Sequence, residues 1–534
     1  MSFAFNSATE QQLSLWDSYE SLTPREKRAL EKSWAKVFAE KIFPKIDETP
    51  YAVLYSDVAS RPNTPVNVII GALILKEFTG QSDDDINTSL MFDIRYQYAL
   101  HTTSFIEQPL SDRTLGRFRE RCITYEKQTG IDLLHDTITA LSEEMAAMMK
   151  VDRSLRRMDS LMVASNIKKM SRLELLYTCA ANLANACKKQ GEVLPEQLRH
   201  YLSADDKNLM IYHNKSEETS DKIASVLADA AELVALCGSK YDELPEFQLM
   251  IRVLSEQAVQ QEDGTYVLRS KGEGMTADCM QNPADPDATY REKAGKKHRG
   301  YAANVIEEAG ENGSVITDYQ YEQNTHSDSE FAKETIAALG EQEEKVTLVA
   351  DGAYSGRDNE RLAQENNIDL RTTNLTGKDT PDINADFRFN EEGTRVIECP
   401  NGQKPKSCSY NARTGQCVVS FHRSQCEGCP YANKCTRKVF KRTVRITISL
   451  NSKNRAMQQR NRETEEFKAL SHFRNGVETV PSMLRRLFNV DHMPVRGKLR
   501  TKFCFGCKIG GLNFLKLCKY EQRLVKCAQI SAIA

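Results

Sequence analysis

The stretch EKVTLVADGAYSG, residues 344–356, decides the fold of this chain. Its apolar residues 346–350 predict a buried strand that stops at a single acid, Asp351, where Gly352 allows the backbone to turn away. A predicted helix at residues 329–341 precedes this strand, and another at 356–367 leads into a further strand at 368–374. Strands that alternate with helices in this way are typical of an α/β fold.

Further strands are predicted earlier in the chain. The stretch LRRMDSLMVASN, residues 155–166, is a short apolar run around Asp159. Residues 300–308 and 314–324 predict a hairpin joined by the turn GENG. Helical patterns fill the region between, from about residue 171 to 255. We therefore expect an α/β core with a mixed sheet and a helical insertion.

The first 150 residues predict a mostly helical domain. The stretch TPVNVIIGALILKEFTG, residues 64–80, reads as a helix with Thr64 as N-cap, Pro65 at the first helical position and Gly80 at its end. The stretch LSDRTLGRFRERC, residues 110–122, predicts a second helix, capped by Ser111.

This second helix has a basic face. Arg113, Arg117 and Arg121 recur at a spacing of four residues and so share one side of a helix. A short helix with such a face is a candidate for reading a DNA major groove. The alternative is the solvated face of an ordinary helix bundle.

Charge is distributed unevenly along the chain. The net charge is −2, with 72 Lys+Arg and 74 Asp+Glu. From Arg395 onward there are 28 basic and 8 acidic residues, a net of +20, which leaves 44 basic and 66 acidic residues before it, a net of −22. A basic region of this kind is the usual electrostatic footprint of nucleic-acid binding. The alternative is a cationic surface that docks on the acidic part of the same protein.

A third acid comes from the stretch SHFRNGVETVPSMLRRLF, residues 471–488. We expect one helix here, although Gly476 and Pro481 weaken the pattern. Its apolar positions are expected to face the core, and Arg474, Glu478 and Arg485 to form a neighbouring stripe. The apolar positions are Val477, Val480, Leu484 and Leu487.

Three of these segments resemble the acidic motifs of DDE-type bacterial insertion-sequence transposases, which have an RNase H-like catalytic domain. They are MDSLMVASN, VADGAYSG and RNGVETVPSMLRR. The last motif in many of these enzymes reads Tyr-x2-Arg-x3-Glu-x6-Lys. Arg474 and Glu478 match it, Arg485 stands at the lysine position, and Ser471 departs from the tyrosine. The stretch from residue 65 to 122 also looks like the helical N-terminal domain of these enzymes.

The resemblance implies that Asp159, Asp351 and Glu478 are catalytic residues that bind two Mg²⁺ or Mn²⁺ ions. Clustered carboxylates suit such hard cations, because like charges at close range must share a proton or a cation. Asp152 is a rival for the first position, but the apolar run follows Asp159. Asp285 and Asp287 read as turn formers.

Cysteines are concentrated in one part of the chain. The stretch CEGCPYANKC sets Cys426, Cys429 and Cys435 close together, with Cys399 upstream. The pattern resembles a zinc-ribbon-like knuckle, in which four thiolates hold a structural Zn²⁺. Reduced thiols in a small β insert are the alternative, and there are three rivals for the fourth ligand: Cys408, Cys417 and His422. Cys504 and Cys507 read as packing residues.

These patterns predict four regions. A helical DNA-binding domain is expected at residues 1–150, and the first part of an RNase H-like core at 151–394. A basic, cysteine-rich β insert is expected at 395–459, and helices that complete the core at 460–534. There is no apolar run of the ~18 residues that would span a membrane, and no signal-peptide pattern. We expect a cytoplasmic protein that associates with the nucleoid when bound to DNA.

The resemblance implies a transposase that binds the terminal inverted repeats of its element, cuts beside them and joins them to target DNA. Arg113, Arg117, Arg121, Arg474 and Arg485 are the candidate DNA contacts. Synapsis of two ends implies a homodimer. A catalytically inactive DNA-binding descendant is the main alternative. A phosphatase with an aspartate nucleophile is disfavoured, because Ala353 stands where a second acid is needed.

Overall fold

The computed structural model describes residues 1–6, 17–58, 60–103, 110–212, 218–270, 274–293, 295–372, 380–461 and 464–531. These residues form two compact units. Unit 1 comprises Met1–Asp152, Ser160–Ser327 and Pro481–Ala534, and unit 2 comprises Arg153–Asp159 and Asp328–Val480. Within the described ranges, no helix has both the length and the apolar character needed to cross a membrane.

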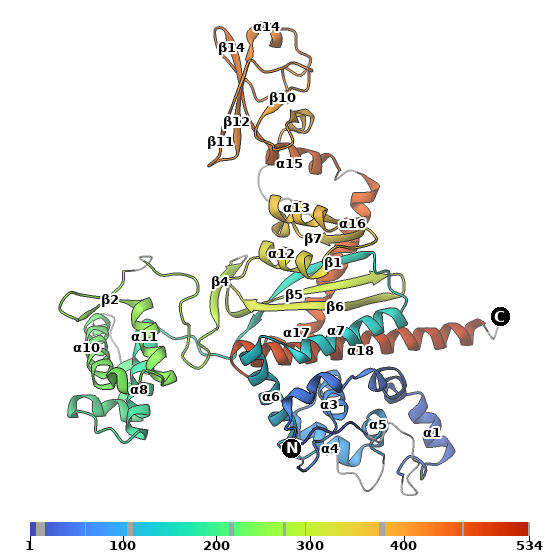
Figure 1. Ribbon diagram of the computed structural model, residues 1–534, viewed down its shortest axis with the longest axis vertical. Coiled ribbons are helices and arrows are strands. Elements are labelled where there is room, and N and C mark those ends of the chain that lie inside the picture. The colour runs from blue at the N-terminus through green and yellow to red at the C-terminus, as the bar shows by residue number, and fades with distance from the viewer. Residues whose placement is uncertain are drawn as a thin grey trace. The chain divides into compact units, whose positions relative to one another are not determined.

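The N-terminal part of unit 1 is helical, as expected. The long helix α18 (Lys498–Ser531) packs against α3 (Val66–Thr79) and α7 (Leu133–Met148), and Figure 1 shows α7 and α18 running alongside each other. Gly511 permits this approach, because a Cβ atom there would lie 3.0 Å from the backbone nitrogen of Phe78. The remaining helices are α1 (Pro24–Glu31), α2 (Trp34–Val37), α4 (Asp83–Phe92), α5 (Ile94–Ala99) and α6 (Thr114–Thr129), with η2 (Phe38–Ile42), η3 (Phe43–Lys45) and η4 (Thr49–Leu54).

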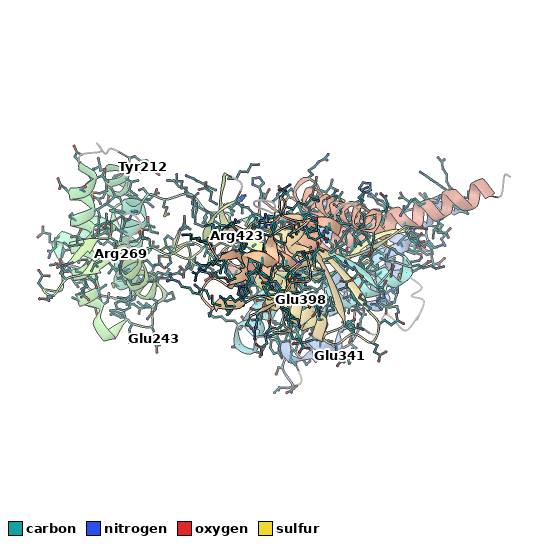
Figure 2. All side chains as sticks on the ribbon, turned by 90° about the horizontal axis from the view of Figure 1, so that it is seen from above. Tyr212, Glu243, Arg269, Glu341, Glu398 and Arg423 are labelled. Atoms are coloured by element: carbon teal, nitrogen blue, oxygen red, sulfur yellow. The ribbon has the colours of Figure 1, made fainter. Side chains whose placement is uncertain are left out.

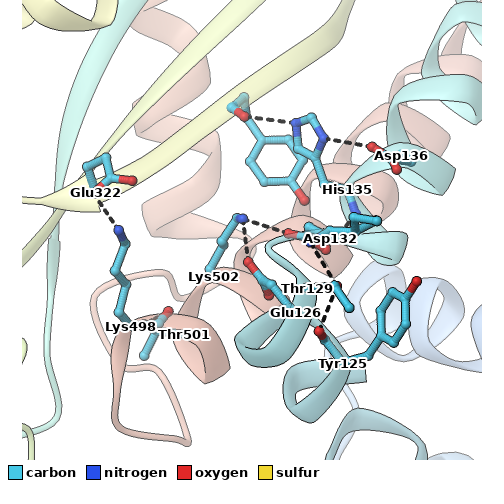
Figure 3. A network of polar contacts seen from close by, with 12 residues as sticks. Tyr125, Glu126, Thr129, Asp132, His135, Asp136, Glu322, Lys498, Thr501 and Lys502 are labelled. Carbon is cyan, nitrogen blue, oxygen red and sulfur yellow. Dashed lines mark hydrogen bonds and ion pairs between the residues drawn. The ribbon is translucent and has the colours of Figure 1, made fainter. Parts of the chain in front are cut away.

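A polar network ties α6, α7 and α18 together (Figure 3). Lys502 on α18 lies 2.7 Å from Glu126 on α6 and 2.8 Å from Asp132, the N-cap of α7. Burial opposes the charge of Lys502, but the two carboxylates outweigh it and raise the pKa of this amine. His135 on α7 pairs with Asp318 at 2.8 Å. Buried charges of this kind are matched by close partners.

The expected starts of two helices were wrong by a few residues. Helix α3 begins at Val66 with Pro65 as N-cap, not Thr64. The buried carboxylate of Glu48 accepts from the backbone N–H of Val66 at 2.7 Å, so a residue far away in sequence caps this helix. Helix α6 begins at Thr114 with Arg113 as N-cap, and Ser111 instead hydrogen-bonds the Thr114 hydroxyl.

Strand β1 (Leu155–Ala164) belongs to a mixed sheet, and the division between the two units falls inside this strand. The strand order is β4-β5-β1-β7-β8, and β6 also pairs with β5. In unit 1, β5 (Lys296–Gly310) pairs antiparallel with β4 (Thr289–Lys293) and β6 (Gly313–Gln323), which confirms the predicted hairpin. Gly300 is required here, because a side chain would clash with the backbone of Val163 and Ser165.

The helical insertion has a hydrophobic core of its own. Leu176, Leu198, Val226 and Met250 are buried within it. Tyr212, Glu243 and Arg269 lie on this insertion (Figure 2). Its elements are α8 (Arg172–Lys189), η5 (Glu196–Leu202), α9 (Ala204–Ile211), α10 (Thr219–Cys237), η7 (Gly238–Lys240), α11 (Pro245–Gln257), β2 (Ala258–Gln260) and β3 (Tyr266–Leu268).

Asp285 lies in a turn, as expected, since the N–H of Ala288 donates to its backbone carbonyl at 3.3 Å, but its side chain also has a packing role. Its carboxylate is fully buried and accepts hydrogen bonds from Ser165 and from the phenol of Tyr301, the latter at 2.5 Å. Burial, followed by this contact, raises the pKa of Tyr301 above its usual range. Asp285 therefore anchors the end of β1 to β5 within unit 1.

Unit 2 contains the second half of the sheet. The start of β1 pairs in parallel with β7 (Val346–Ala350), which pairs in parallel with β8 (Ile368–Thr372). The linking helices α12 (Asp328–Leu339) and α13 (Arg357–Glu365) lie where the sequence predicts them. The expected mixed α/β fold is therefore confirmed, and its strand order is consistent with an RNase H-like core.

A four-stranded antiparallel sheet forms the cysteine-bearing part of unit 2. Its order is β11-β12-β14-β13, and Phe387, Val419, Phe421 and Ile446 pack in a small core beside it. The elements are η9 (Asp382–Asp386), β9 (Arg388–Phe389), β10 (Val396–Glu398), β11 (Ser407–Asn411), β12 (Gln416–His422), α14 (Arg423–Cys426), β13 (Lys438–Val439) and β14 (Thr443–Ser449), followed by α15 (Leu450–Asn461).

The single helix expected over residues 471–488 was wrong. Helix α16 (Glu465–Asn475) ends before a 3-10 turn, η10 (Gly476–Glu478), and α17 (Thr479–Arg486) follows. Val477, Val480 and Leu484 are buried as expected, but Leu487 is 53% exposed because α17 ends at Arg486 and Phe488 enters the core instead.

Candidate functional site: an acidic cluster around Arg474

Two acids lie at the same level of the parallel sheet in unit 2. The parallel pairing aligns Arg157 on β1 with Val349 on β7. Asp159 and Asp351 each follow this pair by two residues, and Arg474 lies within 3.8 Å of both carboxylates. Asp351 is the first residue after β7 and precedes a 3-10 turn, η8 (Gly352–Tyr354). The carboxyl ends of parallel strands are where α/β folds place their sites.

Arg474 joins these acids to Glu478. Its Nη1 atom donates to Glu478 Oε1 at 2.6 Å. Its Nη2 atom lies 3.6 Å from Asp159 Oδ1 and 3.8 Å from Asp351 Oδ2. One guanidinium, with its side chain only 8% exposed, therefore contacts all three carboxylates. Arg474 ends α16 and Glu478 ends η10, so the 3-10 turn directs Glu478 toward its partner.

Arg157 supports this turn from β1. Its Nη1 atom donates to the carbonyl of Phe473 at 2.6 Å, and its guanidinium lies 4.9 Å from the centre of the Phe473 ring. Gly476 leaves room for it, because a Cβ atom there would collide with the Arg157 guanidinium. The strand that carries Asp159 is thus locked to the turn that carries Glu478.

The three acids offer oxygen donors of the kind that hard cations take, and Arg474 supplies the positive charge among them in this structure. Within the described residues, oxygen atoms of these three acids do not all lie within 4.8 Å of one another. Exposure rises from 16% at Asp159 to 35% at Asp351 and 60% at Glu478. The cluster is therefore anchored at the sheet and opens to solvent at Glu478.

The structure does not extend this cluster to Arg485. That residue lies in unit 1, where it pairs with Asp491 at 3.2 Å and donates to the carbonyl of Met162 at 3.2 Å. Asp152, the rival acid, precedes β1 and is outside it.

The three arginines of the predicted basic face differ from one another. Arg113 is exposed and stands just before α6. Arg117 is exposed on the helix, whereas Arg121 is partly covered and lies 4.8 Å from the centre of the Tyr55 ring. Arg117 and Arg121 line one cavity, which also borders Tyr55.

The four candidate zinc ligands line one small cavity of about 30 Å³ in unit 2. They are Cys399, Cys426, Cys429 and Cys435. Burial raises the pKa of Cys435 to about 11, and the other three thiols add to this shift while Arg437 opposes it. Within the described residues, no three of these sulfur atoms lie within 4.8 Å of one another. The four thiols therefore border a common cavity, but their sulfur atoms are further apart than the ligands of one bound metal ion would be.

The rival ligands are placed elsewhere. Cys408, Cys417 and His422 are not among the residues that line this cavity. Cys417 is fully buried, and its thiol donates to the carbonyl of Thr394 at 3.3 Å. Cys504 and Cys507 are buried on α18, in agreement with their interpretation as packing residues.

Sequence reasoning missed two features of this site. Arg474 was expected to contact DNA, but its contact with all three acids was not anticipated. Arg157 was not singled out, although its position two residues before Asp159 places it on the same side of the strand. A basic residue at that spacing beside a strand acid is the signal that could have found it.

Two family models match the chain. The model of the "Transposase DDE domain" matches residues 398–518, and that of the "Transposase domain (DUF772)" matches residues 24–121. The first match includes Arg474 and Glu478, and the second includes Arg113, Arg117 and Arg121. No curated protein matches the chain, and neither does any solved structure.

Proposed function

Because this chain carries the domains of a DDE-type insertion-sequence transposase, we propose that it cuts and joins DNA in a metal-dependent reaction. It would bind the terminal inverted repeats of its element, cleave beside them and transfer the ends to target DNA. The observation that carries this proposal is the contact of Arg474 with Asp159, Asp351 and Glu478. These acids come from three distant segments, and a shared catalytic role explains why they meet.

Asp159, Asp351 and Glu478 would hold the divalent metal, Mg²⁺ or Mn²⁺. When bound, such ions would supply Lewis acidity for in-line displacement at phosphorus. The chain contributes the position of the ligands. The parallel β1–β7 pair fixes the two aspartates, and the turn braced by Arg157 presents Glu478.

Arg474 has a second task in this proposal. Its guanidinium neutralises the acids when they have no other cation. If metal neutralised the carboxylates, the Arg474 guanidinium would become available for a phosphate group. The N–H donors of a guanidinium match the spacing of phosphate oxygens. Arg474 would then hold the DNA backbone beside the acids. The same residue thus keeps the empty cluster stable and orients the substrate.

Basic surfaces would hold the remaining DNA. The cysteine-bearing region exposes Lys438, Lys441, Arg442 and Arg445 near its edge strand. Arg423 lies on the same region (Figure 2). We propose that these residues, with Arg113, Arg117, Arg121 and Arg485, contact phosphates. Such contacts position a protein on DNA and do not select a sequence.

Zinc would close the cysteine cavity. Cys399, Cys426, Cys429 and Cys435 supply four sulfur ligands around one space, which is the donor set of a structural Zn²⁺ site. The raised pKa of Cys435 means that binding would release a proton from a thiol, so affinity would increase with pH. The ion would act as a structural element that fixes the basic strands.

The assembly and location follow from the reaction. Two element ends must be held together before joining, so we propose a homodimer in the synaptic complex. A bacterial DNA substrate places the protein in the cytoplasm, on the nucleoid. A catalytically inactive DNA-binding descendant is the alternative, and none of the observations on the acidic cluster favours it.

A cleavage assay tests this proposal. The substrate is a labelled duplex that carries the terminal repeat flanking the coding region, incubated with Mg²⁺ or with EDTA. We expect cuts at the repeat end that need Mg²⁺ and that disappear in Asp351→Asn. Binding without cutting under all conditions would support the inactive descendant. Absence of both binding and cutting would contradict the transposase proposal.

A further inference from the structure

The N-terminal helical domain contains a cavity of about 600 Å³, outside the acidic cluster. It lies between residues 1–6, the segment after η4, the start of α3 and the first turns of α6. Its volume is within the range of about 300–1,000 Å³ that small-molecule sites occupy. Hydrogen bonds hold its wall in place; for example, the backbone N–H of Ala4 donates to the side-chain Oδ1 of Asn63 at 2.7 Å.

The wall of this cavity is positively charged. Arg61, Arg117 and Arg121 line it, and there is no aspartate or glutamate among the described residues that border it. In the described part of the chain, none of these three arginines forms an ion pair with a carboxylate. By contrast, Arg119, on the same helix, is paired with Asp83 at 2.6 Å. Positive groups that line a concavity without a carboxylate partner favour an anionic occupant.

One wall of the cavity also offers aromatic surface. The Tyr55 ring lies 4.8 Å from the Arg121 guanidinium, and Phe5 and Phe118 contribute further rings. Aromatic rings beside arginine are the surfaces on which nucleic-acid bases stack. Asn63, Thr64 and Thr114 add hydrogen-bonding groups. A ligand that combines an anionic group with a flat ring would use every part of this wall.

We propose that this cavity binds one unpaired nucleotide of a DNA strand, with its phosphate at Arg61 and Arg117 and its base beside Tyr55. A paired nucleotide cannot enter such a space, because its base is stacked and bonded within the duplex. An overhanging or extruded nucleotide can do so. This inference rests on the proposed function and deepens it, since it assigns to the N-terminal domain the recognition of an opened or frayed element end.

The test compares two fluorescent DNA probes with the full-length protein at fixed salt. One is a blunt duplex, and the other is the same duplex with a three-nucleotide single-stranded extension. We expect the extended probe to bind about tenfold more tightly, because each stacked base adds substantially to affinity. Arg117→Gln and Tyr55→Leu should each abolish this preference. Arg25→Gln, an exposed arginine on α1 outside the cavity, should retain it.

Competition identifies the ligand. Thymidine 5′-monophosphate should displace the extended probe at concentrations at which inorganic phosphate does not. Equal displacement by phosphate would overturn the base-binding part of the inference. A preference that persists in both variants, or that is absent in the wild type, would overturn the inference as a whole.

The results distinguish failure of the nucleotide-cavity proposal from failure of the proposed function. Metal-dependent cleavage that requires Asp351, together with equal binding of both probes, would contradict only the nucleotide cavity. Failure to bind either probe would contradict the transposase proposal itself. Circular dichroism of Tyr55→Leu excludes unfolding as the cause of a lost preference, and Arg117 is exposed enough that glutamine should leave the fold intact.

Discussion

Arg474 donates a hydrogen bond to Glu478 at 2.6 Å, across the 3-10 turn that separates α16 from α17. The same guanidinium reaches Asp159 and Asp351. The proposed catalytic acids are therefore held by a positive charge that belongs to the chain. On the proposed function, metal binding and phosphate binding at this cluster would be linked, because both would involve Arg474.

Removal of one acid should abolish cleavage and leave DNA binding intact. We expect Asp159→Asn to reduce the cleavage rate by about 100-fold or more, since the amide keeps the shape and removes the charge. Single-turnover cleavage of the terminal-repeat duplex measures this change. The matched control is Asp152→Asn, which should cleave normally. Equal loss in both variants would contradict the assignment of Asp159.

Removal of Arg474 should strengthen metal binding and weaken the metal-free fold. Arg474→Gln leaves three carboxylates without their shared cation, and we expect a destabilisation on the order of 1–3 kcal/mol, moderated by the exposure of Glu478. Mn²⁺ should raise the melting temperature of this variant more than that of the wild type. Calorimetric titration with Mn²⁺ checks the affinity directly. Arg485→Gln is the control, because Arg485 pairs with Asp491. Unchanged Mn²⁺ affinity in Arg474→Gln would argue against the idea that Arg474 and the metal compete for the same carboxylates.

A side chain at Gly476 should disturb the same cluster without touching an acid. Gly476→Val would push against the Arg157 guanidinium and cost about 1–3 kcal/mol, as overpacking does. We expect a lower melting temperature and slower cleavage. Gly116→Ala on α6 provides the control, since a Cβ atom there meets nothing within 4 Å. A Gly476→Val protein with wild-type stability and rate would show that this brace is not needed.

Zinc content should depend on the cavity cysteines alone. We expect about one zinc per chain in protein purified without chelators, with the content lost in Cys426→Ser and kept in Cys417→Val. Elemental analysis and release of metal to a colorimetric chelator measure this. Because the pKa of Cys435 is raised to about 11, retention should weaken as the pH falls. If the wild-type protein contained no zinc and still cleaved DNA, the zinc prediction would be wrong and the cysteines would be ordinary reduced thiols.

Stability should decrease with rising pH through His135. Burial opposes its protonation, but the hydrogen bond and charge of Asp318 outweigh burial and raise the pKa of this imidazole above 6.5. Protonated His135 therefore contributes stability that is fully present below pH 6.5 and is lost as the pH rises through the folded pKa. Denaturant unfolding across this range should show the loss in the wild type. His135→Gln should show a flatter profile, and an identical slope in both proteins would contradict the role of this pair.

Local patterns determined much of the architecture. The apolar runs around Asp159 and before Asp351, the helices between strands and the hairpin at residues 300–324 are read from a few neighbouring residues each. The structure confirms these elements. They could be predicted because the spacing of apolar residues within a short stretch indicates whether it forms a helix or a strand. The three acids were likewise proposed from sequence, and the structure brings them together around one guanidinium.

Other features arose only from tertiary contacts. Glu48 caps α3 from outside the helix, Asp285 is buried by Ser165 and Tyr301, and Arg157 stabilises the turn at Gly476. These contacts join residues that are between 16 and 316 positions apart in the sequence. Periodicity and capping are encoded within a few residues, so the sequence by itself determined which strands and helices form. The meeting of Arg474 with Asp159 and Asp351 depends on packing between segments far apart in the chain, and only the tertiary structure decided that.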